Sequence, residues 1–133
     1  MTALTADRNT PRKSTDWIYL PVAAGAVIHG GAQVCIKAGF VVPGSEDSTL
    51  IYIDRAEESV DNSAGQDGDR SVNIYRNQAF LWENDPVNPV TQAQVGTACY
   101  ILDDQTVSAS SNSGARATGG KVISLDNDGV WAE

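Results

Sequence analysis

A chain of 133 residues, 41% of them hydrophobic, is long enough to bury a core without help from a metal or a disulfide. Its net charge of −8 at pH 7 argues against nucleic acid as a partner, because phosphate binding needs clustered Lys and Arg. No run approaches the roughly 20 apolar residues of a membrane span, and the polar N-terminus predicts no signal peptide. We therefore expect no membrane partner and synthesis in a cytoplasm.

The first 16 residues are polar and follow no structural period. They carry Arg8, Arg12 and Lys13 against two aspartates, so this segment has a net charge of +1 and the rest of the chain carries −9. Pro11 lies in the middle of the segment and disfavours regular structure there. Two interpretations stay open for residues 1–16. They are either a disordered terminus or an arm that becomes ordered on a partner. We expect one β-domain to follow at 17–133.

Short apolar runs separated by Gly, Pro, Asn and Asp follow the arm. They are typical of β-strands, and no helical period extends over a useful length. The expected strands lie at residues 17–22, 32–38, 40–42, 50–53, 71–76, 79–82, 98–102, 105–109, 121–125 and 130–131. Pro21 lacks a backbone N–H, which places the first strand at an edge or marks its end. The pattern predicts an all-β fold, a small barrel or sandwich of about eight to ten short strands with long polar loops.

Residues 89–108, P-V-T-Q-A-Q-V-G-T-A-C-Y-I-L-D-D-Q-T-V-S, combine several local signals. We expect the Thr91 hydroxyl to accept a hydrogen bond from a backbone N–H and so cap a short helical turn. Gly96 is expected to end that turn in a left-handed conformation. A hairpin should follow, with Asp103 and Asp104 in its turn. Its strand 98–102 should direct Cys99 and Ile101 toward the core.

Cys35 and Cys99 each lie in an apolar, strand-like run. Buried free thiols are one interpretation, because Cys often packs as a small hydrophobic residue. A disulfide between them is the other, and the sequence leaves both open.

The chemistry-bearing residues form no recognisable reaction centre. His29 stands in a Gly-rich turn with no nucleophile or acid nearby in sequence, so we expect a surface or structural role. The Asp126-x-Asp128-Gly129 turn resembles the start of a calcium loop but lacks the bidentate Glu further on, which favours a plain hairpin turn. Loose calcium binding by Asp61, Asp67 and Asp69 is a disfavoured alternative. We predict no metal site, no cofactor and no enzyme activity.

Several segments together resemble a family of small capsid cement (decoration) proteins of tailed phages and prophages. The residues 89–108 quoted above resemble the family's C-terminal half. The polar start M-T-A-L-T-A-D-R-N-T-P-R, the hairpin region 23–44, the loop and strand 55–77 and the final D-N-D-G-V-W turn fit the same pattern. The likeness covers nearly the whole chain in order, and it consists of turns and strands without a catalytic signature.

The resemblance implies a protein that is made in the host cytoplasm and joins the exterior of an assembled capsid. It would stabilise the virion by bridging neighbouring capsomers. The implied partners are the major capsid protein and, in a homotrimer, further copies of the chain. Under this interpretation residues 1–16 become a docking arm, in which Arg8, Pro11, Arg12 and Lys13 meet an acidic capsid surface.

The aromatic residues offer the other candidate contacts. Most should pack in the core, but one or two at a subunit interface are expected, because aromatic side chains are enriched there. The candidates are Trp17, Tyr19, Trp82 and Trp131. Exposed Trp and Tyr can also stack on sugars. The alternative function is therefore a carbohydrate- or host-surface-binding β-module of a phage tail or fibre.

Overall fold

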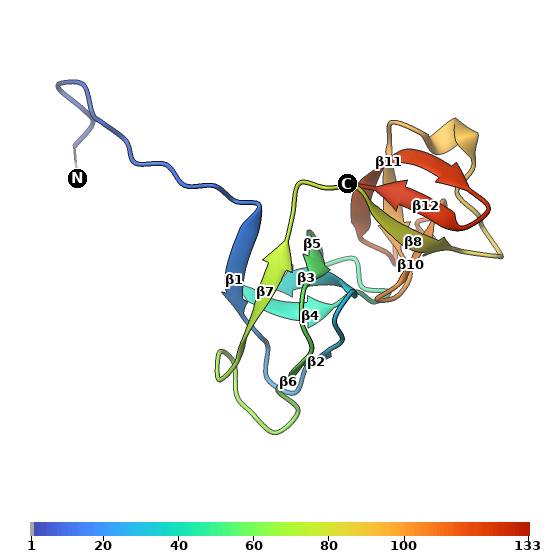
Figure 1. The fold of residues 1–133 in the computed structure, drawn as a ribbon, viewed down its shortest axis with the longest axis horizontal. Coiled ribbons are helices and arrows are strands. Elements are labelled where there is room, and N and C mark those ends of the chain that lie inside the picture. Colours follow the sequence, from blue (N-terminus) through green and yellow to red (C-terminus); the bar gives the residue numbers. More distant parts are fainter. Residues whose placement is uncertain (1) are drawn as a thin grey trace.

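The computed structural model describes residues 2–133, which form an extended N-terminal arm, a β-sheet and a β-barrel (Figure 1). The sheet is antiparallel and has the strand order β1-β7-β5-β3-β4. Its strands are β1 (Trp17–Pro21), β3 (Gln33–Lys37), β4 (Phe40–Pro43), β5 (Ile51–Ala56) and β7 (Ser71–Tyr75). Two short strands, β2 (Val27–Ile28) and β6 (Val60–Asp61), pair with each other beside this sheet.

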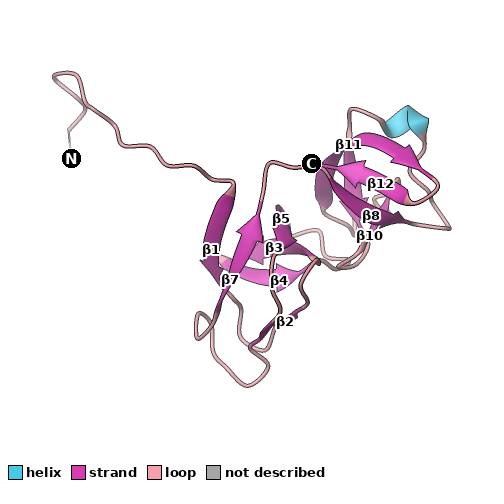
Figure 2. Ribbon diagram, in the orientation of Figure 1, coloured by secondary structure: helices cyan, strands magenta, loops and turns pink. Residues whose placement is uncertain are grey.

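The C-terminal half closes into a five-stranded barrel with the order β10-β8-β12-β11-β9. Only β10 and β8 pair in parallel. One turn of 3-10 helix, η1 (Gln92–Gln94), lies outside the barrel wall (Figure 2). The barrel strands are β8 (Phe80–Asn84), β9 (Ala98–Ile101), β10 (Thr106–Ser108), β11 (Thr118–Asp126) and β12 (Gly129–Ala132).

The predicted all-β fold is confirmed. Residues 2–133 contain twelve strands, more than the eight to ten expected. The difference comes largely from β2 and β6, which are two residues long and leave no periodic signal in the sequence. The expectation that 17–133 is a single domain stays a prediction.

Pro21 ends an edge strand, as expected. β1 pairs with β7 on one side, from Trp17 opposite Tyr75 to Pro21 opposite Ser71. Immediately after Pro21 the chain reaches the other end of the sheet, where Val22 forms a parallel bridge with Val41 of β4. The Ala23 N–H donates to the Val41 carbonyl (3.0 Å). The two outer strands of the sheet are thus joined at one end only.

The core consists of three buried clusters. The first fills the sheet half and is centred on β3, β4 and β7, with Val34, Val41, Val72 and Ile74 all fully buried. The second fills the barrel and includes Trp82, Cys99, Val107, Val122 and Val130. The third lies between the two halves, and its members are Cys35, Leu50, Ile101 and Ala117. This third cluster ties the sheet to the barrel through apolar contact.

A buried polar contact accompanies that apolar cluster. The Gln33 side chain is fully buried, and its Nε2 donates to the carbonyl of Asp103 (2.6 Å) in the turn before β10 and to that of Thr106 (2.9 Å), the first residue of β10. The Gln33 backbone N–H donates to Asp104 O (2.8 Å), and its carbonyl accepts from Gly44 N (2.9 Å). One residue of β3 therefore connects β4 to the barrel, and we call this contact the junction.

An ion pair also crosses between the halves. Arg116, whose side chain is only 9% exposed, donates from Nε to Glu46 Oε2 (3.0 Å) and from Nη1 to Ser108 Oγ (3.1 Å). Hydrogen bonds from Arg116 and then Asn112 hold the pKa of the exposed Glu46 carboxyl below its usual value. Glu46 follows β4 and Ser108 ends β10, so the Arg116–Glu46 ion pair links the same two elements as the junction.

Residues 89–108 fold largely as predicted. Gly96 is left-handed (φ 89°), Cys99 and Ile101 are buried, and Asp103 Oδ1 accepts from the N–H groups of Gln105 and Thr106 in the turn. Thr91 is the N-cap of η1, as predicted, and forms a capping box with Gln94. The Thr91 hydroxyl also donates to Gln94 Oε1 (2.9 Å), and the same oxygen accepts from the Thr91 N–H (2.7 Å). The two side chains thus cap the turn together.

The junction predicts a strong size limit at Gly44. A Cβ atom there would lie 2.9 Å from the Asp103 carbonyl oxygen and 3.1 Å from both Gln33 Cγ and Ile101 Cγ2. We expect Gly44→Ala to lower the free energy of unfolding by about 1–3 kcal/mol, the usual range for overpacking. Urea denaturation measures it.

Gly30→Ala is the matched control, because the nearest heavy atom to its added Cβ would be at an ordinary 3.5 Å. Its unfolding midpoint should stay close to that of the parent chain. Equal midpoints for the two variants would contradict the close approach of sheet and barrel at Gly44.

Candidate functional site

The N-terminal arm, residues 2–16, extends away from the rest of the molecule (Figure 1). All of its residues are exposed, including Leu4 at 72%. Within residues 2–13, the only hydrogen bonds join Arg8 to Thr10. The first ties to the body come from Asp16, whose carbonyl accepts from Arg76 N (2.8 Å) and whose Oδ1 accepts from Asn77 Nδ2 (2.8 Å). The arm is therefore free to contact another molecule along its whole length.

The predicted binding residues lie close together in sequence on the extended backbone of the arm. Arg8, Pro11, Arg12 and Lys13 are all exposed, and none of the three basic side chains forms an ion pair within residues 2–133. Their role in binding stays a prediction. The arrangement provides three unpaired positive charges at the edge of a strongly acidic body.

The arm leads directly into an aromatic row that crosses the molecule. Trp17 stacks on Tyr75 with ring centroids 4.4 Å apart, Tyr75 meets Phe80 edge-on at 6.1 Å, and Phe80 lies 6.2 Å from Trp82. Arg55 lies over the Phe80 ring at 5.6 Å. The row starts on the exposed edge strand β1 and ends inside the barrel.

The four candidate interface aromatics separate into two groups. Trp17 (56% exposed), Tyr19 (64%) and Trp131 (36%) present their rings at the surface. Trp82 is only 4% exposed and belongs to the barrel core, so its prediction as an interface residue is corrected. The reason is the strand period: Trp82 and Leu81 point to opposite faces of β8, and Trp82 faces the barrel core.

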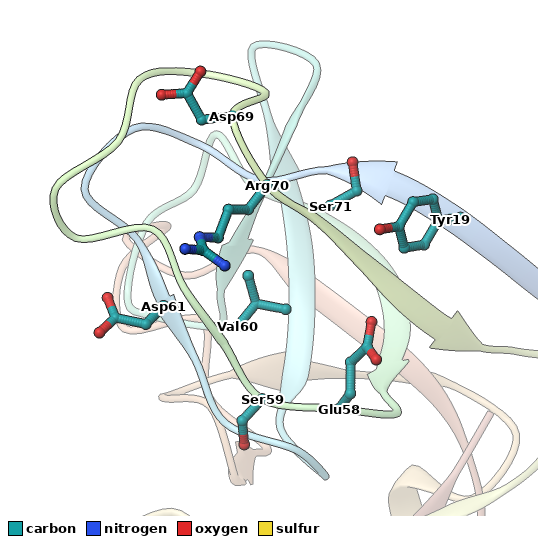
Figure 3. A pocket seen from close by; sticks show the side chains of 8 residues that line it. All are labelled: Tyr19, Glu58, Ser59, Val60, Asp61, Asp69, Arg70 and Ser71. Atoms are coloured by element: carbon teal, nitrogen blue, oxygen red, sulfur yellow. The ribbon is translucent and has the colours of Figure 1, made fainter.

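A groove opens beside Tyr19, between the start of β7 and the segment before β6 (Figure 3). Its lining is mostly polar and acidic: Tyr19, Glu58, Ser59, Val60, Asp61, Asp69, Arg70 and Ser71. Glu58 Oε1 accepts from both the backbone and side-chain nitrogens of Asn73 (3.1 Å each). Sequence reasoning did not find this groove, because its residues come from three separate segments.

The carboxylates considered for calcium serve local turns. Asp67 Oδ1 accepts from Ala24 N (2.7 Å), Asp69 Oδ2 from Gln66 N (2.8 Å) and Asp61 Oδ1 from Ser63 N (2.9 Å). Hydrogen bonds from Ser63 hold the pKa of Asp61 below its usual value. Within residues 2–133, no three His, Cys, Asp or Glu side chains gather in a way that could hold a metal ion.

The remaining candidates are also accounted for locally. His29 is exposed beside Gly30, Gly31 and Asp104, and its side chain makes no hydrogen bond within the described residues. Asp126 Oδ1 accepts from Asp128 N (2.8 Å), while its Oδ2 accepts from Trp131 Nε1 (3.3 Å). The Asp126 turn is thus a hairpin that also orients an exposed tryptophan.

A buried polar cluster at the barrel-facing side of β5 escaped sequence reasoning. The Tyr52 hydroxyl donates to Asp54 Oδ1 (3.2 Å), and Arg76 Nε lies 3.6 Å from Asp54 Oδ2. Burial raises the pKa of both Tyr52 and Asp54 above their usual values. Asp54 has φ 107°, an unusual conformation for a residue with a side chain, and it coincides with a register shift between β3 and β5. The cluster holds an irregular strand against the barrel.

Comparison of the chain with protein-family models, curated proteins and solved structures finds no match. Among the helices of residues 2–133, none has the length and apolar character needed to cross a lipid bilayer.

The two cysteines are free and buried, which favours the first of the two interpretations left open by the sequence. Burial raises the pKa of each thiol to about 12. At pH 8 only about one molecule in ten thousand would then carry a given thiolate, the form that reacts with disulfide reagents.

We therefore expect Cys35 and Cys99 to be unreactive toward a colorimetric disulfide reagent at pH 8 in the folded protein, and both to react after unfolding in urea. A Val87→Cys variant, at a position that is 80% exposed, supplies a reactive control in the folded state. Rapid reaction of either native thiol, or fewer than two thiols after unfolding, would contradict the buried free pair.

Proposed function

We propose that this chain is a phage capsid decoration (cement) protein. It binds the exterior of the assembled capsid and stabilises it by bridging neighbouring capsomers. The observation that supports this most directly is the arm. Residues 2–16 extend from an acidic all-β body and make almost no contact with it, and their three basic side chains form no ion pair within the described part of the chain. Such a segment gains most of its contacts from another molecule.

A basic arm on an acidic body fits the physical requirements of a cement protein. A ligand that binds only the assembled shell stabilises that shell by mass action. Many identical copies make individually weak contacts effective together. The body, which carries −9 of the chain's charge, keeps a decorated surface soluble through mutual repulsion. The basic arm would meet acidic surface on the major capsid protein, and the homotrimer implied by the family resemblance is our proposal for the shell-bound state.

Co-sedimentation tests the proposal. Purified protein is mixed with expanded capsids that lack decoration, and the mixture is centrifuged through a cushion. We expect the protein to pellet with the capsids at a fixed ratio per capsomer and to raise the temperature at which they open. Protein that stays in the supernatant at saturating concentration would contradict the proposed function.

The arm predicts a charge-dependent contribution to this binding. Arg12→Glu should weaken capsid binding by about tenfold at low salt, equivalent to about 1.4 kcal/mol, and by less at high salt because ions screen exposed charges. Lys121→Glu is the matched control, since Lys121 is also exposed, makes no ion pair and lies on the barrel. Equal weakening by both variants would show that net charge matters and the arm does not.

The alternative, a sugar-binding module, has weaker support. Sugar stacking needs an open aromatic face, and one face of Trp17 is already covered by Tyr75. Binding to glycans on an array, with loss of that binding in Trp131→Ala, would favour the alternative.

A further inference from the structure

β1 has an unused side. It lies at one end of the strand order and pairs only with β7 before Pro21. Two hydrogen bonds fix which of its backbone groups face β7: Arg76 N donates to Asp16 O (2.8 Å) and Val22 N donates to Arg70 O (2.8 Å). Antiparallel partners exchange bonds at alternate residues. Ile18 and Leu20 therefore direct their N–H and C=O groups toward β7, whereas Trp17 and Tyr19 direct theirs away from it.

The unused side is short and sharply bounded. Past Tyr19, Pro21 has no N–H to offer, and β4 takes up the same side of the chain at the Val22–Val41 bridge. Two N–H groups and two carbonyls, those of Trp17 and Tyr19, thus remain without a strand partner in residues 2–133. We call this stretch, Trp17 to Tyr19, the β1 edge.

The β1 edge lacks the usual protection against pairing. Exposed edges are commonly blunted by a charged side chain, a proline or a bulge. Here W-I-Y carries no charge, and the rings of Trp17 and Tyr19 are 56% and 64% exposed on one face. Ile18 points to the other face and packs against the sheet's core. An added strand would find free backbone groups and a row of aromatic surface.

The chain's own arm cannot supply that strand. It enters β1 directly at its N-terminal end and extends away from the body (Figure 1). Its residues 2–13 make no hydrogen bond to residues 17–133. The partner must therefore come from a different molecule.

We infer that in the free chain, before any shell-bound trimer forms, the β1 edge pairs with the β1 edge of a second copy, antiparallel, about a two-fold axis through Ile18. In this register Trp17 lies opposite Tyr19 of the other copy, and the two residues exchange both backbone hydrogen bonds. The two-fold axis repeats the exchange, giving four bonds in all. Ile18 lies opposite Ile18 of the second copy. The two form a non-hydrogen-bonded pair of the antiparallel ladder, in which Cα atoms are about 4.5 Å apart. Each outward ring adjoins another across the new strand pair, a favourable arrangement.

Charge complementarity supports this occupant. The second copy's arm would leave the pairing near Pro21, where the loop containing Asp67 and Asp69 lies. A Cβ at Gly68, between these aspartates, would be 3.8 Å from Pro21 Cβ and 3.7 Å from the Phe40 ring. Side chains alternate along an extended chain, so Lys13 shares the face of Trp17 and Tyr19 and approaches this acidic loop. Arg8 and Arg12 take the opposite face and remain available for the proposed capsid contact.

The test uses the purified chain without capsids, so its outcome is separate from that of the proposed function. Tyr19→Pro removes an N–H that bonds no strand within one copy, whereas Tyr19→Ala keeps that N–H and removes only the ring. Sedimentation equilibrium should give twice the chain mass for the parent protein, a weaker dimer for Tyr19→Ala and a monomer for Tyr19→Pro. A monomeric parent, or an assembly unaffected by Tyr19→Pro, would overturn the inference.

A cross-link keeps the inference testable if Tyr19→Pro fails to fold. Ile18→Cys places two cysteines opposite each other at a separation that suits a disulfide. We expect it to form a disulfide-linked dimer under mild oxidation, visible on a non-reducing gel. The exposed Val87→Cys variant should cross-link far less, because Val87 is remote from the edge in the barrel half. Equal cross-linking of both variants would also overturn the inference.

Discussion

The close contact between β3–β4 and the turn before β10 is the constraint on which the rest of this structure depends. The Gln33 side chain donates to one carbonyl of that turn and to one at the start of β10, and Gly44 supplies the room for the approach. Moving the sheet away from the barrel would leave these buried carbonyls without a hydrogen-bond donor. The free-energy cost of that loss opposes any loosening of the contact. Because Cys35, on the same strand, packs with Ile101 of the barrel, polar and apolar contacts fix the same orientation. The sheet and the barrel are thus held in one relative orientation, although each has its own core.

This arrangement leaves β1 on the side of the sheet away from β3 and β4, apart from the bridge at Val22. The strand is nevertheless coupled to the barrel through the rings of Trp17, Tyr75, Phe80 and Trp82. A force on the arm would enter the body at Asp16, which Arg76 and Asn77 hold. It would then pass along packed aromatic surface into the barrel core. The base of the arm is thus connected to the barrel core, which suits a protein proposed to hold neighbouring units together.

The fold was largely readable from the sequence, since strand alternation and turn residues act locally. Val72 and Ile74 alternate with polar neighbours, and Gly96 marks a left-handed turn. The closure of the barrel was not readable, because it depends on the parallel pairing of β8 with β10, and a pairing between strands distant in sequence leaves no local signal. Burial was misjudged for Trp82, where only tertiary packing decides which face of β8 is inside. The acidic groove was also missed, because its lining comes from segments that are distant in the sequence. The β1 edge was missed because the sequence does not show which backbone groups lack a partner.

The Val22–Val41 bridge has a consequence for solubility during assembly. A flat sheet with two open sides can recruit chain after chain and grow into a fibre. Here the bridge draws the two terminal strands of the sheet together, and only the three residues ahead of it stay accessible. Any strand that docks there fills the available length and leaves little template for another. The sheet can pair with one added strand and no more, which suits a protein proposed to accumulate before its binding sites on a capsid form.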